Sequence, residues 1–363
     1  MWLTNQCNIH CVMCPFISAE YPNKTYYNEE PFFASLKDVK KILPKKKWFD
    51  KEGRESGEAI EFNFFKGETF LNPHTMEICR YIKRVYKNSR IAILSNGTIP
   101  PQSEEMVKYI DVLGFSLDGG TKQVFESIRV PADFEHVLNT IRSWVRARNK
   151  YHPKLLLRTS TTLSTMNFMD LPNIVEAVGK IAQEEGGGWD SVYCQPVVIE
   201  DYQDPRLRKI TLEYVDKEQG KESLKAAKRI ADKYHIRMDV PQSIYEMFED
   251  ISIKGQTGEE NDFPHKEVFC DKLRNGYLSY DQSGRVGFAC CFMDKKYWRE
   301  LIERYQIPDN KPPEIIYNCE GYWRLRQDLL EGKLRRECRN CTIGQSEYYR
   351  LYEKFGRERD SLQ

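Results

Sequence analysis

Short apolar runs alternate with amphipathic helical stretches over residues 1–200, and this alternation limits the possible folds more than any other feature. Candidate strands, rich in β-branched and aromatic residues, are Trp2–Thr4, Ala59–Phe65, Arg90–Leu94, Val112–Leu117, Leu155–Thr159 and Ser191–Gln195. Between them the pattern predicts helices over Leu36–Leu43, His74–Tyr86, Gln102–Tyr109, Ala132–Asn149 and Leu171–Glu185. Strands and helices in this order predict a parallel sheet with right-handed crossovers. The expected fold is therefore α/β, a partial (β/α)6 TIM-like barrel that is open on one side.

A loop with three cysteines follows the first expected strand directly. Cys7, Cys11 and Cys14 stand in the run Cys-Asn-Ile-His-Cys-Val-Met-Cys. Chemistry in such folds collects at the carboxyl ends of the strands, where this loop is expected to lie. Iron–sulfur clusters usually take four thiolates, so three from one loop leave an iron open to a substrate or cofactor. A zinc site or a buried thiol cluster is the alternative, although zinc sites usually pair C-x2-C with a second pair or with histidines.

The C-x3-C-x2-C spacing of this loop resembles the signature of radical S-adenosylmethionine (radical SAM) enzymes. The resemblance implies a [4Fe–4S] cluster on Cys7, Cys11 and Cys14 whose open iron binds the amino and carboxylate groups of SAM. It further implies that the reduced cluster cleaves SAM to a 5′-deoxyadenosyl radical. The matching motifs run from Met1 to about Pro196.

Further motifs that resemble this family follow the expected strands in order. Lys66-Gly67-Glu68-Thr69 resembles the Gly-Gly-Glu-Pro stretch, which implies that Gly67 and Glu68 bind the SAM ammonium group. The first Gly and the Pro of that stretch are Lys and Thr here, and a solvated Glu68 in an ordinary turn is the alternative. Ser95-Asn96-Gly97 resembles the next turn, where Ser95 and Asn96 either line the site or only shape a tight turn.

Two later strands supply the remaining expected SAM contacts. In relatives the serine at the position of Ser116 approaches the SAM ribose hydroxyls. The nearby Asp118 is expected first to cap the following helix and alternatively to line the site. Arg158 is expected to pair with the SAM carboxylate, or alternatively to form a structural salt bridge. Asn167 and Gln195 are weaker candidates near strand ends, and the run Phe125-Glu126-Ser127-Ile128-Arg129 also resembles the family.

A second group of cysteines lies in the last third of the chain. Cys270, Cys290, Cys338 and Cys341 resemble the auxiliary [4Fe–4S] site of a Twitch domain, the short form of the SPASM domain. Cys291 is the rival of Cys290, and Cys319 has no assigned role. A structural zinc ribbon is the alternative. A hairpin is expected over Tyr277–Tyr280 and Arg285–Ala289, and a final helix over Tyr322–Glu331. Cys79 and Cys194 are expected to be buried thiols.

These features predict four regions along the chain. Residues 1–200 form the core barrel, 201–265 a helical bridge in which the alternation of strands and helices lapses, 266–345 the Twitch/SPASM-like domain, and 346–363 a charged tail. The 55 basic and 54 acidic side chains give a net charge of +1, which argues against a nucleic-acid partner. No apolar stretch approaches the roughly 20 residues of a membrane span. With 11 cysteines and no signal peptide, a reducing cytoplasmic location is expected.

The resemblance implies an enzyme that takes hydrogen from a substrate C–H bond, with an electron donor of the flavodoxin or ferredoxin type. Because no peptide-recognition module precedes the first strand, a net oxidation of a carbohydrate-like small molecule is expected first. A peptide- or protein-modifying maturase is the close alternative. A non-catalytic zinc protein is the alternative of another class. A molybdopterin-type cyclisation enzyme is disfavoured, because the chain ends Asp-Ser-Leu-Gln rather than in Gly-Gly.

Overall fold

The computed structural model describes the following parts of the chain: residues 3–14, 32–43, 61–199, 205–248, 278–280, 286–288, 295–309, 311, 315–316 and 319–330. The chain divides into two compact units. The larger contains residues 2–39 and 45–251, and the smaller contains residue 1 and residues 40–44 and 252–363.

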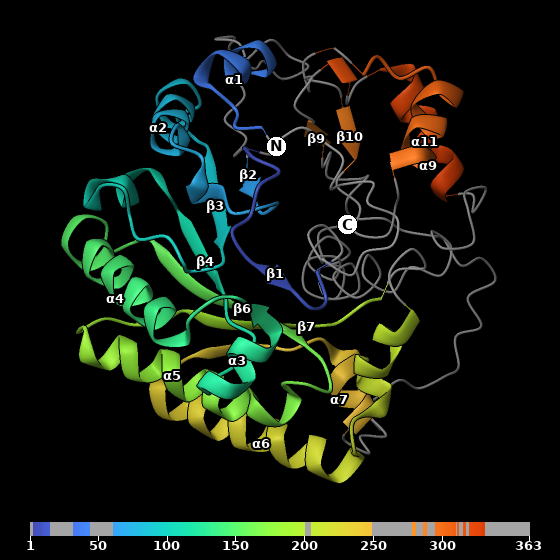
Figure 1. Cartoon of the computed structure of the whole chain (residues 1–363). Coiled ribbons are helices and arrows are strands. Elements are labelled where there is room, and N and C mark those ends of the chain that lie inside the picture. The colour runs from blue at the N-terminus through green and yellow to red at the C-terminus, as the bar shows by residue number, and fades with distance from the viewer. Residues whose placement is uncertain are drawn as a thin grey trace, which may run out of the picture. The chain divides into compact units, whose positions relative to one another are not determined.

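A six-stranded parallel sheet forms the centre of the larger unit (Figure 1). Its strands, in spatial order, are β2 (Glu61–Phe64), β3 (Arg90–Ser95), β4 (Val112–Ser116), β6 (Leu156–Leu163), β7 (Ser191–Pro196) and β8 (Arg237–Asp239). Every strand expected between residues 59 and 195 is present, so the predicted α/β fold with a parallel sheet is confirmed. The sheet is not closed into a full barrel, since β2 and β8 are its two edges.

The expected first strand, Trp2–Thr4, is not a member of this sheet in the described part of the chain. Thr4 instead forms an isolated antiparallel bridge with Phe33. Individual hydrogen bonds hold the segment beside the end of β2. Asn72 Nδ2 donates to the carbonyl of Leu3 at 2.8 Å, and the Glu68 N–H donates to the carbonyl of Gln6 at 2.7 Å. Because side chains and one loop hold this segment, no sheet ladder is needed to position the cysteines that follow it.

The expected lapse of the strand–helix alternation after residue 200 is also wrong. Helix α6 (Lys217–Tyr234) leads to β8, which pairs in parallel with β7 and adds the sixth strand. The sequence Arg237-Met238-Asp239 has no apolar run, so its pattern does not predict a strand. Its position depends on the packing of α6 against α5 (Leu171–Glu184), where the Tyr234 ring covers Gly179 so closely that a Cβ there would lie 2.4 Å from it.

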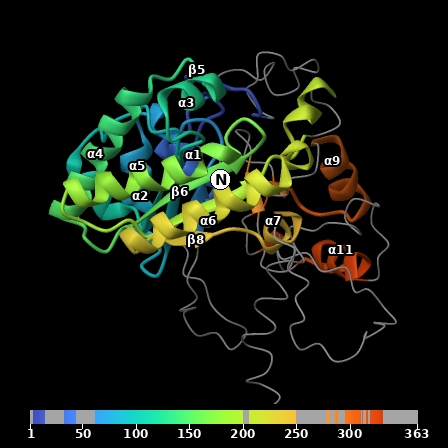
Figure 2. The same cartoon turned by 90° about the horizontal axis from the view of Figure 1, so that it is seen from below.

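Helices cover one side of the sheet, and α4, α5 and α6 follow one another along it (Figures 1 and 2). Besides α5 and α6, the α-helices described here are α1 (Leu36–Ile42), α2 (Thr75–Val85), α3 (Lys122–Ile128), α4 (Phe134–Tyr151) and α7 (Gln242–Phe248). The helix expected over Gln102–Tyr109 is a 3-10 helix over Glu104–Tyr109, and further 3-10 turns span Thr69–Leu71, Phe168–Asp170, Pro205–Ile210 and Leu212–Tyr214. Among the described helices, none has the length and apolarity required to cross a membrane.

The two faces of the sheet differ in polarity. In β6 the side chains of Leu157, Thr159, Thr161 and Leu163 are buried, whereas the alternate residues Arg158, Ser160 and Thr162 are partly exposed. Successive side chains of a strand point to opposite faces, so one face of β6 is packed in the core. The other face is mainly polar, apart from the exposed Leu156. The polar face is therefore available to a ligand.

The smaller unit contains the expected hairpin and the expected last helix. Strands β9 (Leu278–Tyr280) and β10 (Val286–Phe288) pair antiparallel, and α11 (Glu320–Leu330) lies where a helix was predicted. A further helix, α9 (Lys295–Arg304), was not predicted. The Tyr305 hydroxyl donates to Asp328 at 2.6 Å and so links the end of α9 to α11.

Candidate active site at the cysteine loop

The three-cysteine loop is held by a short antiparallel ladder. Strand β1 (His10–Cys11) pairs with β5 (Arg129–Val130), and in this register Cys11 lies opposite Arg129. The Val12 N–H donates to the carbonyl of Ile128 at 2.9 Å, which extends the pairing by one bond. Cys7, Cys11 and Cys14 are all partly exposed.

Burial favours the neutral form of two of these thiols. It raises the pKa of Cys7, and it raises the pKa of Cys11 to about 12. Metal ligation requires the thiolate, so a bound cation must offset this effect at neutral pH. In the described part of the chain, no three His, Cys, Asp or Glu side chains gather around a point where a single ion would bind.

The end of β3 lies against Cys7. Asn96 Nδ2 donates to Cys7 Sγ at 3.5 Å and to Asn8 Oδ1 at 2.9 Å. Asn96 Oδ1 accepts from the backbone N–H of Thr98 at 2.9 Å. These bonds fix the orientation of the Asn96 side-chain amide. Its oxygen accepts from the turn after β3, and its nitrogen faces the Cys7 sulfur.

Glu68 connects the ends of β2 and β3. Its fully buried carboxylate accepts from the backbone N–H groups of Asn96 at 2.6 Å and Phe70 at 3.0 Å, and from Ser95 Oγ at 3.1 Å. Burial raises the pKa of Glu68 to about 6 even though these donors lower it. Gly67 has φ of +64°, and a Cβ at this position would lie 2.5 Å from the carbonyl oxygen of Gln6. Four of the expected SAM contacts, Gly67, Glu68, Ser95 and Asn96, therefore lie together beside the cysteine loop.

Two residues at the end of β4 have different environments. Ser116 is the last residue of β4, is partly exposed, and pairs in register with Ser160 of β6. The expectation that Asp118 caps the next helix is wrong. Asp170 accepts the N–H groups of Gly120 and Thr121 ahead of α3, at 2.6 Å and 3.1 Å. Asp118 is instead fully buried, and its Oδ1 accepts the backbone N–H of Thr162 at 2.7 Å.

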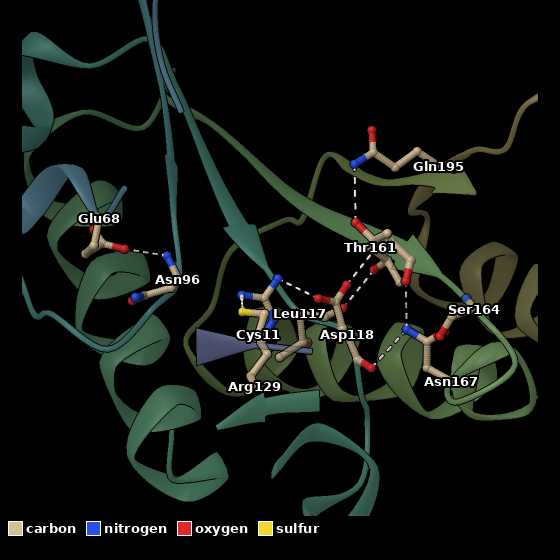
Figure 3. A network of polar contacts seen from close by, with 11 residues as sticks. Cys11, Glu68, Asn96, Leu117, Asp118, Arg129, Thr161, Ser164, Asn167 and Gln195 are labelled. Carbon is tan, nitrogen blue, oxygen red and sulfur yellow. Dashed lines mark hydrogen bonds and ion pairs between the residues drawn. The ribbon is translucent and has the colours of Figure 1, made fainter. Parts of the chain in front are cut away.

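Arg129 joins Asp118 to the cysteine loop, and the sequence pattern gave it no role. Its Nη2 forms an ion pair with Asp118 Oδ2 at 2.5 Å, and its Nη1 donates to Cys11 Sγ at 3.6 Å. Figure 3 shows these three side chains pointing toward one another from β1, β5 and the loop after β4. Arg129 is buried, and no hydrogen-bond partner for its Nε–H occurs among the described residues.

The weaker candidates Asn167 and Gln195 belong to the same network. Asn167 Nδ2 donates to the carbonyl oxygens of Asp118 and Thr162, both at 3.0 Å, and Gln195 Nε2 donates to Thr162 Oγ1 at 3.2 Å (Figure 3). These bonds connect the end of β4 with β6 and β7. Asn167, in the loop after β6, thereby fixes the backbone at Asp118.

Arg158 is not brought to the cysteine loop. It is the third residue of β6, near the amino end of the strand, and it pairs with the first residue of β7. Burial lowers the pKa of Arg158, and the charged groups that act on it include Glu61, Arg90 and Asp239. Glu61 and Arg90 are the first residues of their strands. Arg158 therefore lies toward the amino ends of the strands, whereas the cysteine loop lies toward their carboxyl ends.

The expected auxiliary ligands Cys270, Cys290, Cys338 and Cys341, and the rival Cys291, lie outside the described residues. Cys319 is described, and its Sγ accepts the backbone N–H of Tyr322 at 3.3 Å in the first turn of α11. Cys79 and Cys194 are buried, as predicted.

The chain is similar to several known proteins. Residues 3–178 match the sequence profile of the Radical SAM superfamily. A Helicobacter pylori (strain J99) protein described as "UPF0026 protein" is 34% identical over 82 residues, which span 22% of this chain and 27% of the relative. This chain therefore matches only about a quarter of the length of that curated relative.

Solved structures of Streptococcus suis SuiB share the fold. One superposes with a TM-score of 0.53 at 12% identity and covers 90% of this chain and 66% of SuiB. SuiB bound to its precursor peptide SuiA gives a TM-score of 0.52 at 10% identity, with coverage of 90% and 65%. A further SuiB structure contains S-adenosylmethionine. At this identity the similarity concerns the fold.

Proposed function

The chain belongs to the radical SAM superfamily, whose model it matches over residues 3–178, and we propose that Cys7, Cys11 and Cys14 hold the [4Fe–4S] cluster of a SAM-cleaving enzyme. The observation that carries the proposal is the surroundings of the three thiols. Asn96 and Arg129 direct N–H donors at two of the sulfurs, as outer partners of metal-ligating thiolates do. A cluster would also supply the positive charge that Cys7 and Cys11, whose pKa values are raised, need in order to ionise.

The ends of three strands offer the groups for SAM. Gly67 and Glu68 form the turn beside the cysteines, with the Glu68 carboxylate fixing that turn and the backbone presenting carbonyl groups to the SAM ammonium. Ser95 and Asn96 complete the turn after β3, and the partly exposed Ser116 provides a hydroxyl for the ribose. Arg158 is not among these groups, because it lies near the amino end of β6.

When bound, the cluster supplies one electron that cleaves SAM to methionine and a 5′-deoxyadenosyl radical, which takes a hydrogen atom from a substrate carbon. The protein's own contribution is position and shielding. An apolar cluster of Met13, Ile128, Val197, Leu207 and Ile210 packs beside the loop, with Cys11 and Met166 against it. This wall keeps water from one side of the thiols, which protects a reactive radical from side reactions.

The polar face of the sheet suggests the chemistry of the substrate. Toward the carboxyl ends of β6 and β7, Ser160, Thr162 and Gln195 present neutral hydroxyl and amide groups, whereas the charged Arg158 of the same face lies near the amino end. These neutral groups suit a substrate with amide or hydroxyl groups better than a strongly charged one. SuiB, which shares the fold, has been solved with a precursor peptide, so we place peptide modification first. Oxidation of an alcohol-bearing, carbohydrate-like small molecule is the second candidate for the same hydrogen-bonding groups.

A second [4Fe–4S] cluster on Cys270, Cys290, Cys338 and Cys341 would make the overall reaction an oxidation, because it gives the electron of the substrate radical an acceptor. The predicted hairpin and the predicted last helix, which lie between these cysteines in the sequence, are both present and support this proposal. The first cluster would receive its electron from a flavodoxin- or ferredoxin-type protein.

Anaerobic reconstitution tests the proposed function. The wild-type chain should bind about eight irons, four per cluster, and release 5′-deoxyadenosine from SAM when reduced. Cys7→Ala, Cys11→Ala and Cys14→Ala should each abolish that release, whereas the control Cys79→Ala removes a buried thiol outside the loop and should retain it. Joint replacement of Cys338 and Cys341 by Ala should leave SAM cleavage intact. A wild-type chain that binds only zinc, or releases no 5′-deoxyadenosine, would overturn the proposal.

A further inference from the structure

We propose that Arg129, anchored by Asp118, is a positioning residue that raises the reduction potential of the cluster held by the three-cysteine loop, an inference that rests on the proposed function. The evidence is the contact between a buried guanidinium and one ligating sulfur. Arg129 stands opposite Cys11 in the β1–β5 ladder, and its Nη1 lies 3.6 Å from Cys11 Sγ.

The guanidinium has little freedom to turn away from that sulfur. Its Nη2 is fixed at 2.5 Å by Asp118 Oδ2, and the side chains of Arg129 and Asp118 are 9% and 0% exposed. Asp118 is itself held by the Thr162 N–H at Oδ1. The backbone on either side is tied down as well, since Thr161 Oγ1 donates to the carbonyl of Leu117 at 2.8 Å and Asn167 Nδ2 to that of Asp118 at 3.0 Å (Figure 3).

The pair is oriented with its positive end on the sulfur. Nη2 of the guanidinium is ion-paired with the Asp118 carboxylate, while Nη1 donates to the Cys11 sulfur. The Nε–H has no hydrogen-bond partner among the described residues, which leaves a buried donor for an acceptor that the protein does not supply. A buried donor is costly when unpaired, and a cluster beside Cys11 would offer acceptors.

Such a contact favours the reduced cluster. Reduction adds one negative charge to a cluster that thiolates already make negative, and a nearby cation with an N–H donor stabilises that added charge. Hydrogen bonds to the sulfurs and local charge are established determinants of iron–sulfur potentials. Burial strengthens the effect, because the pair is little screened by water. Arg129 would thereby make electron delivery to the SAM-binding cluster easier.

A salt bridge with a purely structural role would not move the potential, so the potential is the decisive measurement. The variants are Arg129→Gln, which removes the charge, and Arg129→Lys, which keeps it but loses the planar fork that reaches Asp118 and Cys11 together. Arg148→Gln is the matched control. Arg148 is also buried and donates to the carbonyl of Gly188 at 2.6 Å, outside the cysteine site.

Each reconstituted protein is titrated anaerobically with dithionite, and the reduced SAM-binding cluster is followed by electron paramagnetic resonance. Replacing both Cys338 and Cys341 by Ala in every protein removes the expected auxiliary signal. Arg129→Gln should shift the ratio of oxidised to reduced cluster at least tenfold toward the oxidised form, about 59 mV for a one-electron couple. Arg129→Lys should shift it less, and Arg148→Gln should leave it unchanged.

The proposed function and the role of Arg129 can be overturned separately. A wild-type chain that binds no iron overturns the proposed function and this role of Arg129 together. A wild-type cluster whose potential is the same in both Arg129 variants overturns only the role of Arg129. If Arg129→Gln does not retain a cluster, Arg129→Lys decides the question, and an unchanged potential in that variant overturns the inference.

Discussion

Asn96 at the end of β3 donates its side-chain N–H to the sulfur of Cys7, at 3.5 Å, and donates its backbone N–H to the buried carboxylate of Glu68, at 2.6 Å. One residue thus links a proposed cluster ligand to the turn proposed to hold SAM. The contact spans 89 positions of the sequence, so it depends on the fold rather than on the cysteine loop alone.

Asn96→Ala should weaken cluster retention without preventing folding. The variant leaves the Cys7 sulfur without its donor and leaves Asn8 without its amide partner, and such outer-shell changes typically lower metal affinity about 10- to 100-fold. Iron release to a chelator, followed by absorbance, measures the effect. Asn149→Ala is the control, because Asn149 makes a comparable amide bond to the carbonyl of Glu185 at 2.8 Å far from the site. Equal iron release from both variants would contradict this role of Asn96.

Gly67→Ala should destabilise the site by about 1–3 kcal/mol, in the range for a strained positive-φ residue. The backbone is at φ +64°, and the new Cβ would lie 2.5 Å from the Gln6 carbonyl oxygen, so the segment leading to Cys7 must move. Denaturant unfolding and iron loading should both report the change. Gly188→Ala is the matched control, since a Cβ there meets no atom within 4 Å. Wild-type iron loading in Gly67→Ala would show that this close approach is not required.

The central strands could be predicted because their residues carry the signal themselves. Apolar, β-branched runs such as Arg90–Ser95 and Leu156–Leu163 read as strands whatever lies beside them. Leu3 and Thr4 gave the same signal, yet Asn72 and the turn at Gly67 hold them outside the sheet. Arg237–Asp239 gave no signal, because that strand depends on a neighbouring strand and on α6.

The site was predictable where one loop or turn carries it and not where distant residues meet. Cys7, Cys11 and Cys14 and the turns at Gly67 and Ser95 are local patterns. Arg129 was missed because its partner Cys11 lies 118 positions away and the two meet through a ladder of two-residue strands. For Asp118 a local cap was placed ahead of a position lining the site, but Asp170 fills the cap role.

The titration of Glu68 should appear as a pH-dependent stability difference from Glu68→Gln. Burial raises its folded pKa to about 6 from an ordinary value of 4.5. Between these values the folded state binds the proton more tightly than the unfolded state, so this contribution to stability is present below pH 4.5 and is lost as the pH rises through 6. The loss amounts to about 2 kcal/mol.

Denaturant unfolding of the cluster-free wild type and Glu68→Gln, at pH 4 and pH 7, checks this. The glutamine cannot titrate, so the difference between the two proteins isolates the carboxyl group. The wild type should be more stable relative to the variant at pH 4 than at pH 7. A difference that grows in the opposite direction would mean that the bonds from Asn96 and Phe70 outweigh burial.

Arg158→Gln should leave SAM binding nearly unchanged, contrary to the role that the sequence pattern suggests. Arg158 lies near the amino end of β6, among charges at the starts of neighbouring strands, whereas Glu68, Asn96 and the cysteines lie at the carboxyl ends. Equilibrium dialysis of SAM with the reconstituted protein should give a Kd within about twofold of wild type, less than half a kcal/mol. A tenfold weaker Kd would reinstate Arg158 as the partner of the SAM carboxylate. Ser116→Ala provides the positive comparison, since its hydroxyl is proposed to bind the ribose and its loss should weaken SAM binding by about 0.5–1.5 kcal/mol.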